Sequence, residues 1–416
     1  MIERFQAGDP AALKRPDGRD DPALLDAVRV IVDDVRRRGW DALVEQALRI
    51  DGAAPEQIAV ASYSAEARRT LPADAIAAMT LARRNIENFH RLTRPRDVEV
   101  VTMPGLSVAK QWRPLTSAGL YVPGGKAPLF STLMMLAIPA RVAGVSQLTV
   151  VTPPRRGGGL DPAIALAAEL CGIASIWTVG GAQAIAALAF GAGDIPAVDR
   201  IAGPGNAWVA AAKALVASLP GGPGIDLPAG PSELMVIADA SANPVTLAAD
   251  LLSQAEHDPT AQVILVTPDA ALIDAVEAEL DRQIESIGGV FAPARAILCA
   301  DLDEACEIAN AYAPEHLSLA TDAAETLIAR ISSAGAIFAG HHAAETFGDY
   351  LAGSSHVLPT DGAARFTGGV STLSFMKAIT VQRVAPKAAR ALAAPAAALA
   401  RLEGLEAHAR AAEARA

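Results

Sequence analysis

Stretches typical of β-strands alternate with stretches typical of helices over most of the chain. From residue 118, the strand-like runs AGLYV, QLTVV and SIWTV are each followed by a run of helical length. The same order returns after residue 233 with LMVIA, QVILV, ARAIL and AGAIF. Because strand, helix and strand in succession form the repeating unit of α/β folds, the pattern predicts parallel sheets with helices on their faces.

The alternation falls into two blocks, which predicts two Rossmann-like, doubly wound lobes with a cleft between them. With 416 residues the chain is long enough for two or three domains. No precise internal repeat relates the blocks, so duplication stays a hypothesis. The predicted parts are an N-terminal helical segment, a first lobe in two pieces, a second lobe inserted between them, and a helical C-terminal tail: 1–20, 21–117 with 234–370, 118–233, and 371–416.

Both ends of the chain are predicted to be mostly helical. Before about residue 115, apolar residues recur at spacings of three and four. After about residue 384 the tail is rich in alanine, and we expect a break in its helix near Pro395. Such a tail buries little apolar surface alone, so we expect it to pack on the body of the protein or on another subunit.

Charge and composition argue against several kinds of partner and location. A formal net charge of −11 disfavours nucleic acid and anionic membrane surfaces. The most apolar stretch, 131–145, is interrupted by Pro139 and Arg141 and is too short to span a bilayer. The first ten residues lack the apolar core of a signal peptide. The cysteines form no CxxC pair and are predicted to be reduced core residues of a cytoplasmic protein: Cys171, Cys299 and Cys306.

Three glycine-rich turns follow predicted strands, at 122–128, 179–185 and 202–208. Ligands of open α/β sheets bind beyond the carboxyl ends of strands, and the helix after such a turn offers free N–H groups to a phosphate. None of the turns matches G-x-G-x-x-G, the usual dinucleotide fingerprint. The spacing alone therefore leaves two readings open, a nucleotide site and tight turns without a ligand.

Two short polar groups of residues stand out. Gln254 and His257 are three residues apart and would share a helix face, either as two ligands of a metal or as an ordinary polar helix end. Glu315 and His316 place a carboxylate beside an imidazole. That pair suits acid–base chemistry near neutral pH, although a surface turn can also hold it.

Asp349 and His356 lie in a Gly/Ser-rich stretch, 347–360, which is predicted to be a loop of the kind that carries active-site groups. His408 lies in the tail, five residues after Glu403. Gln, His, Asp and His would form a set of nitrogen and oxygen ligands compatible with a catalytic or substrate-binding Zn²⁺. The remaining histidines are predicted to lie on the surface or in loops: His90, His341 and His342.

A series of longer motifs resembles the histidinol dehydrogenase family. In order they are GLYVPGG, LAIPARVAGV, VGGAQAIAALAFG, IAGPGN, DLPAGPSELMVIAD, LLSQAEHDPTAQVILVT, YAPEHL, GDYLAGSSHVLPT and ARFTGGVS. The resemblance is dense from about residue 115 to 382 and weaker in the N-terminal helices and the tail. It implies a zinc-dependent enzyme that oxidises L-histidinol to L-histidine with two NAD⁺ through a bound aldehyde, in the last step of histidine biosynthesis.

The resemblance also implies site residues. His316 matches the general base, and Glu315 matches the residue that helps to activate water in the second oxidation. The zinc ligands would be Gln254, His257, Asp349 and His408. The same four residues, with Ser232, His316, His356 and Glu403, would contact the substrate, and Tyr121, Gln183 and Asn206 would contact NAD⁺. Members of the family are homodimers in which the tail completes the partner's site, so Glu403 and His408 would act across the interface.

Some segments depart from the family pattern: 124–132, Ser355 where asparagine is common, and the GHHAAE run. One alternative is an NAD-dependent dehydrogenase of another small primary alcohol, such as a sulfonated propanediol; Ser232, His356 and Glu403 favour histidinol. Another is a non-catalytic metal-binding scaffold, which the intact Glu315–His316 pair disfavours. A zinc hydrolase is a third, but four protein ligands would leave little room for a zinc-bound water.

Overall fold

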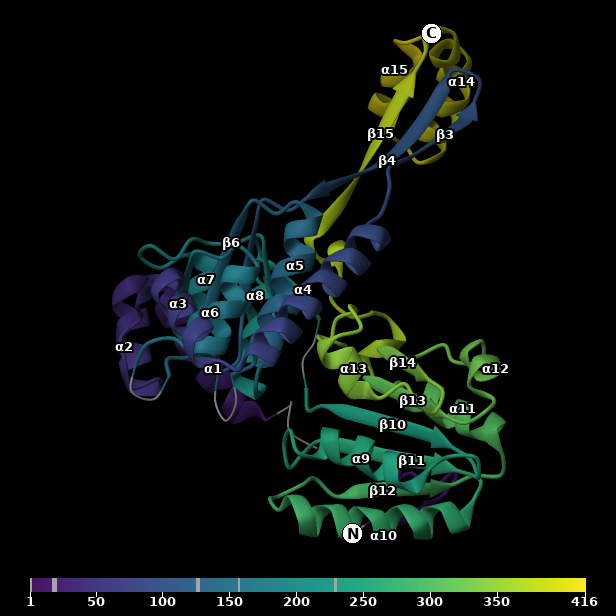
Figure 1. Cartoon of the computed structure of the whole chain (residues 1–416). Helices are drawn as coiled ribbons and strands as arrows, with labels where there is room; N and C mark the ends of the chain where they lie inside the picture. The colour runs from purple at the N-terminus through teal and green to yellow at the C-terminus, as the bar shows by residue number, and fades with distance from the viewer. Residues whose placement is uncertain (1, 17–20, 125–127, 156–157, 228–229) are drawn as a thin grey trace. The chain divides into compact units, whose positions relative to one another are not determined.

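The computed structural model describes residues 2–16, 21–124, 128–155, 158–227 and 230–416. The turn predicted at 122–128 and the segment 1–20 therefore lie partly outside the described residues. The chain forms two compact units, Met1–Thr93 with Thr116–Phe375, and Arg94–Leu115 with Met376–Ala416. The first unit contains two six-stranded sheets and the second a three-stranded sheet (Figure 1). The predicted α/β class with largely parallel sheets is confirmed.

The sheet of the first lobe, sheet I, has the order β1-β12-β11-β10-β13-β14 and is parallel throughout. Its strands are β1 (Ile2–Gln6), β10 (Glu233–Ala238), β11 (Gln262–Thr267), β12 (Ala294–Leu298), β13 (His316–Ala320) and β14 (Ala336–Ala339). Its helices are α9 (Pro244–Ala255), α10 (Ala270–Ile287), α11 (Leu302–Tyr312), α12 (Ala324–Ile328) and α13 (Glu345–Tyr350).

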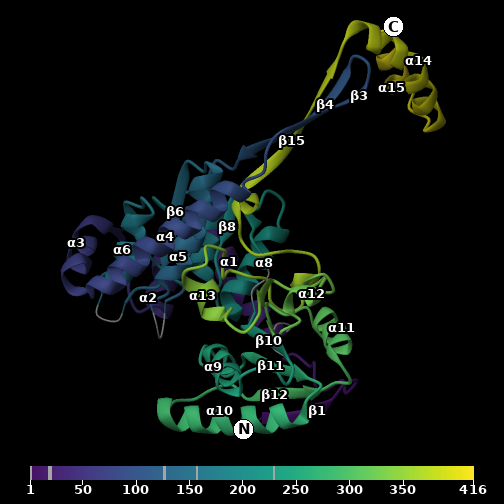
Figure 2. The same ribbon diagram turned by 45° about the vertical axis from the view of Figure 1, so that its right-hand side comes forward.

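Sheet I is buried on both faces, which explains why its central strands read as continuous apolar runs. Along β10, Leu234 and Val236 belong to the core beneath α9 and α10. Met235 and Ile237 belong to the opposite core, beneath α11 and α12. This alternation follows from the two-residue period of a strand, and Figure 2 shows the two layers of helices.

The sheet of the second lobe, sheet II, has the order β2-β7-β6-β5-β8-β9 and is parallel except for β2. Its strands are β2 (Gln57–Ala59), β5 (Ser117–Tyr121), β6 (Gln147–Thr152), β7 (Ser175–Thr178), β8 (Arg200–Ala202) and β9 (Gly224–Ile225). The helices around it are α1 (Pro22–Arg38), α2 (Trp40–Ile50), α3 (Val60–Thr70), α4 (Ala73–Thr93), α5 (Phe130–Ala143), α6 (Pro162–Leu170), α7 (Gly181–Phe190) and α8 (Ala207–Ser218). Short 3₁₀ helices lie much later in the chain, after α13, at Ala363–Arg365 and Thr372–Phe375.

Two predictions about the N-terminal region are wrong. The start of the chain is not helical, because β1 pairs in parallel with β12 at the edge of sheet I. The region 21–93 does not accompany the first lobe, since β2 pairs with β7 and helices α1, α3 and α4 pack on α7, α6 and α5. The apolar stripe of a helix shows that it packs, but it does not identify the sheet that it packs on.

The second unit contains strands that the sequence patterns did not reveal. β3 (Val98–Met103), β4 (Leu106–Pro114) and β15 (Met376–Val384) form an antiparallel sheet, followed by α14 (Pro386–Leu402) and α15 (Glu406–Glu413). The prediction of a helical tail over 371–416 is therefore wrong in part, because β15 lies within it. The expected break at Pro395 is also absent, since α14 continues through it while packing against α15.

The positions of the cysteines and of three histidines can be compared with the predictions. All three cysteines are buried and unpaired, as predicted. His341 and His342 lie in the turn after β14, also as predicted. His90 does not lie on the surface: its side chain is fully buried on α4. No helix of the described ranges is long and apolar enough to cross a membrane.

Candidate active site

One pocket of the first unit brings together many of the residues singled out in the sequence. It is lined by Ser232, Gln254, His257, Glu315, His316, Asp349 and His356. The amino ends of β10 and β13 form one wall, and Thr132 of α5 with Gly203 after β8 contribute from the second lobe. Among the described residues that line the pocket, none is lysine or arginine. The titratable side chains that line the pocket are thus mainly carboxylates and imidazoles.

The geometry at His316 defines which ring nitrogen can act as a base. His316 begins β13, and its Nδ1 lies 3.0 Å from the backbone carbonyl oxygen of Glu233. A carbonyl can only accept, so Nδ1 carries the hydrogen and Nε2 carries the lone pair. Nε2 is buried, has no hydrogen-bond partner among the described residues, and lies 3.8 Å from Asp349 Oδ1. Burial lowers the pKa of His316 to about 3, so the ring is neutral at pH 7.

Glu315 is held next to this imidazole. Its Oε2 accepts a hydrogen bond from the backbone N–H of Glu233 at 2.9 Å and lies 3.5 Å from His316 Nδ1. Burial raises the pKa of Glu315 well above the usual range. A carboxyl group with a raised pKa beside a neutral imidazole can exchange protons with a bound molecule.

Glu345, at the start of α13, is a site residue that the sequence analysis missed. Its Oε1 lies 3.8 Å from His316 Nδ1, and its Oε2 has no hydrogen-bond partner in the described part of the chain. Burial, followed by the nearby Asp349 and Glu315 carboxylates, raises its pKa well above the usual range. The sequence could have revealed it, because Glu345 is four residues before Asp349 and that spacing places both carboxylates on one helix face.

A cluster of possible metal ligands lies at the base of the pocket. His316, Glu345 and Asp349 offer ligand atoms that all lie within 4.8 Å of one another. Gln254 lies beside this cluster. With its amide group oriented to satisfy both neighbours, its oxygen accepts from the N–H of Glu233 and its nitrogen donates to Glu345. Burial raises the pKa of Asp349 to about 6. Bringing several buried carboxylates together is unfavourable without a cation, and nitrogen and oxygen donors are ligands that Zn²⁺ accepts. Gln254, His257 and Asp349, which line the same pocket, therefore offer a donor set that fits a zinc ion and leaves His316 as a base.

The backbone around two predicted ligands differs from the prediction. Gln254 is in the last turn of α9, but His257 lies beyond the helix, in an exposed turn, so the two do not share a helix face. Asp349 lies on α13 and not in a loop. All three nevertheless line the same pocket, because the turn after α9 and the helix α13 both border it.

His356 links the two lobes across the pocket. Its Nδ1 donates to the backbone carbonyl of Asp349 at 3.1 Å, and its Nε2 accepts the hydroxyl of Thr132 at the same distance. Its backbone N–H lies 3.1 Å from the sulfur of Met135. Burial lowers the pKa of His356 to about 4. Both ring nitrogens are thus occupied by protein groups.

Glycine-rich turns lie at the carboxyl edge of sheet II. The strand order reverses between β5 and β8, and ligands of doubly wound sheets bind at such a switch point. Gly203, directly after β8, has φ +132°, and a Cβ there would lie 2.1 Å from the carbonyl oxygen of Tyr121. Lys213 donates to the carbonyl of Gly203 at 2.8 Å, and the backbone N–H of Gly203 donates to Asp226 at 2.7 Å. Lys213 and Asp226 also form an ion pair with each other. This buried ion pair, which the sequence analysis missed, holds the turn beside the pocket.

The three predicted NAD-contact residues lie around these turns and not among the residues that line the pocket. The hydroxyl of Tyr121 accepts the N–H of Gly181 at 3.2 Å. Gln183 is fully buried and donates to Asp51 at 3.1 Å. Asn206 caps α8 through the N–H of Val209.

Glu403 and His408 are exposed residues of the second unit, Glu403 at the end of α14 and His408 on α15. The residues that line the pocket all belong to the first unit.

Comparisons with known proteins identify the family. A family model described as histidinol dehydrogenase matches residues 14–416. The histidinol dehydrogenase of Xanthomonas campestris pv. campestris is 44% identical over 407 residues, which cover 96% of this chain and 94% of that protein. That of Rhizobium meliloti is 45% identical over 393 residues, covering 92% and 90%. A crystal structure of histidinol dehydrogenase from Elizabethkingia anophelis superposes with a TM-score of 0.94 at 36% identity, covering 100% of this chain and 98% of that one. The chain therefore belongs to the histidinol dehydrogenase family.

Proposed function

We propose that this chain oxidises L-histidinol to L-histidine through bound L-histidinal, with two NAD⁺ and one Zn²⁺ per subunit, as the last step of histidine biosynthesis. The single observation that carries the proposal is the buried, neutral imidazole of His316. Its Nε2 has no hydrogen-bond partner among the described residues, and Glu315 lies beside the ring. An alcohol cannot lose hydride readily unless a base removes its hydroxyl proton, and the unpartnered Nε2 supports this role for His316.

In the first oxidation, His316 Nε2 takes the hydroxyl proton while hydride leaves the carbinol carbon for NAD⁺. The imidazolium that forms is stabilised because Nδ1–H already donates to the Glu233 carbonyl. The aldehyde must then add one water before a second hydride can leave. After His316 has released its first proton to solvent, Glu315, which lies beside the ring, assists it in removing a proton from that water. The sum is one water consumed and two NADH released per histidinol.

Gln254, His257 and Asp349 would hold the zinc ion, and His408 would complete its ligands. When bound, the ion anchors the imidazole and amine of the substrate and offsets the charge of the buried carboxylates. Both Gln254 and His257 line the pocket, and Gln254 is buried whereas His257 is exposed. Ser232 and His356, which also line the pocket, would contact the substrate.

The NAD⁺ would bind at the switch point between β5 and β8, with Tyr121, Gln183 and Asn206 around it. The Gly203 turn supports this placement, because it borders both that switch point and the catalytic pocket. The first turn of α8, in which Asn206 caps the N–H of Val209, begins at this turn, and the N-terminus of a helix suits a phosphate.

We further propose a cytoplasmic homodimer in which Glu403 and His408 complete the partner's site. The second unit supports an interface, since it exposes large apolar side chains, Leu402 at 85% and Val101 at 69%. Large apolar side chains that are exposed in a single chain can be covered by a partner. Three unpaired cysteines are consistent with a reducing compartment.

A second candidate is oxidation of another small primary alcohol, such as a sulfonated propanediol. It is favoured by one observation, that both ring nitrogens of His356 are already bonded within the protein. Steady-state NADH formation with L-histidinol and with 2,3-dihydroxypropane-1-sulfonate separates the two. Histidinol should be preferred in kcat/KM by at least about a hundredfold, because an ammonium and an imidazole suit the acidic pocket and a sulfonate does not. Equal values, or preference for the sulfonate, would contradict the proposal.

A further inference from the structure

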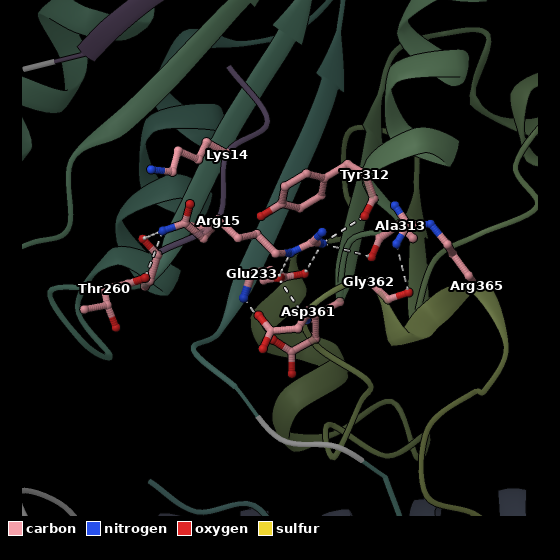
Figure 3. Close-up of polar contacts among 12 residues, drawn as sticks. Lys14, Arg15, Glu233, Thr260, Tyr312, Ala313, Asp361, Gly362 and Arg365 are labelled. Carbon is pink, nitrogen blue, oxygen red and sulfur yellow. Dashed lines mark hydrogen bonds and ion pairs between the residues drawn. The ribbon is translucent and has the colours of Figure 1, made fainter. Parts of the chain in front are cut away.

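The side chain of Glu233 is a buried carboxylate outside the proposed proton chemistry. It is 1% exposed. Arg15 from the N-terminal segment donates hydrogen bonds to both of its oxygens, from Nε to Oε1 at 2.6 Å and from Nη2 to Oε2 at 3.1 Å. The N–H of Asp361 donates to Oε1 at 3.1 Å (Figure 3). Two parallel hydrogen bonds from a planar guanidinium fix the orientation of a carboxylate and also balance its negative charge.

The backbone of the same residue holds both catalytic groups. The N–H of Glu233 donates to Glu315 Oε2 at 2.9 Å, and its carbonyl accepts from His316 Nδ1 at 3.0 Å. Glu233 is the first residue of β10, so the ladder of the sheet restrains it from one side only. The clamp on its side chain therefore restrains a peptide to which Glu315 and His316 are both bonded.

Arg15 also holds the segment that leads to those two groups. Its Nη2 donates to the carbonyl of Tyr312 at 2.9 Å, and its guanidinium lies 3.8 Å from the centre of the Tyr312 ring (Figure 3). Tyr312 ends α11, and Ala313 follows with φ +56°, an uncommon conformation for a residue with a side chain. Arg15 thus holds the first residue of β10 and the end of α11, which leads to Glu315 and His316.

We propose that Arg15 and Glu233 form a positioning pair for the dehydrogenase reaction, which keeps His316 in the Nδ1–H tautomer and keeps Glu315 beside it. In the other tautomer Nε2 would carry the hydrogen and could not accept the substrate's proton. The inference rests on the proposed role of His316 in catalysis. Stability alone does not explain the pair, because replacing a buried ion pair with apolar residues often costs a protein little.

The test uses the full-length enzyme and two variants. Glu233→Gln keeps the shape of the side chain and removes its charge, and the double variant Arg15→Met with Glu233→Leu replaces the whole pair by apolar side chains. Imidazole ¹⁵N spectra at one fixed pH report the tautomer, with His316 assigned by its absence in His316→Asn. The matched control is Arg4→Met, which removes two other ion pairs of the N-terminal segment, with Asp274 and Glu277, neither of which lines the pocket.

We expect the His316 signals of both test variants to move from the Nδ1–H tautomer to a mixture. We also expect kcat to fall about tenfold or more, while the KM for histidinol stays within about threefold, because the base is impaired and the substrate ligands are intact. Arg4→Met should match the wild type in both measurements. An unchanged His316 spectrum in a folded double variant would overturn the proposal, even if kcat fell. If histidinol were not the substrate, kcat would be uninformative but the spectra would still decide.

Discussion

Replacing His90 by leucine should stabilise the protein, and should do so more strongly in acid than at neutral pH. The imidazole of His90 is fully buried on α4, and neither ring nitrogen has a hydrogen-bond partner among the described residues. Burial lowers its pKa from 6.5 to about 4. Leucine has a similar volume and no polar atoms, so it should fill the site without those costs.

The magnitude has two parts. Leaving a neutral polar group buried without partners costs about 1–3 kcal/mol, and leucine removes this cost at every pH. As the pH falls from about 6.5 to 4, the unfolded chain takes up a proton at His90 that the folded protein does not. At pH 5 this linkage lowers the stability of the wild type by about 2 kcal/mol, which the variant does not lose.

Urea unfolding of both proteins at pH 7.5 and pH 5.0 measures the difference directly. The matched control is His342→Gln, which removes an imidazole from an exposed position. We expect the control to follow the wild type at both pH values, and the gap between His90→Leu and the wild type to widen by about 2 kcal/mol in acid. A gap that is independent of pH would refute the reasoning, and so would a variant less stable than the wild type at pH 5.0.

Three further predictions concern the site. His316→Asn should lower both oxidations by about 10²–10⁴-fold, whereas Glu315→Gln should impair aldehyde oxidation more than alcohol oxidation; equal losses in assays that start from histidinol and from histidinal would contradict the division of roles. Gly203→Ala should destabilise the protein by about 2–4 kcal/mol, because its Cβ would meet the carbonyl at the end of β5 at 2.1 Å; an unchanged melting temperature would disprove this clash. Refolding a mixture of His316→Asn and His408→Asn chains should restore about a quarter of the wild-type activity if the tail is exchanged, and none if each chain completes its own site.

The alternation of apolar strands and helices was sufficient to predict both parallel sheets, since strands buried on two faces need continuous apolar runs. It could not assign the helices of residues 21–93 to a sheet, because their partners lie far away in the sequence. The edge strand Ile2–Gln6 was missed for a related reason, as its only neighbour in sheet I is nearly 300 residues further on.

The motifs predicted most of the pocket, but not the side chains that support it. Arg15 and Glu233 are 218 residues apart, and each reads as an ordinary charged residue in its own segment. His90 is different, because its burial could have been predicted. It continues the buried stripe of Met79, Ala82 and Ile86 at helical spacing. The prediction of a surface position relied on the polarity of histidine, whereas the helical spacing of the buried residues would have predicted its burial correctly.

The most direct test of the proposed function is the yield of NADH from limiting L-histidinol, measured before chelation, after chelation, and after zinc is added back. We predict two NADH for each histidinol, no turnover after chelation, and recovery with zinc. One NADH per histidinol would contradict the two-step oxidation. No NADH from a folded, zinc-loaded protein would contradict histidinol as the substrate.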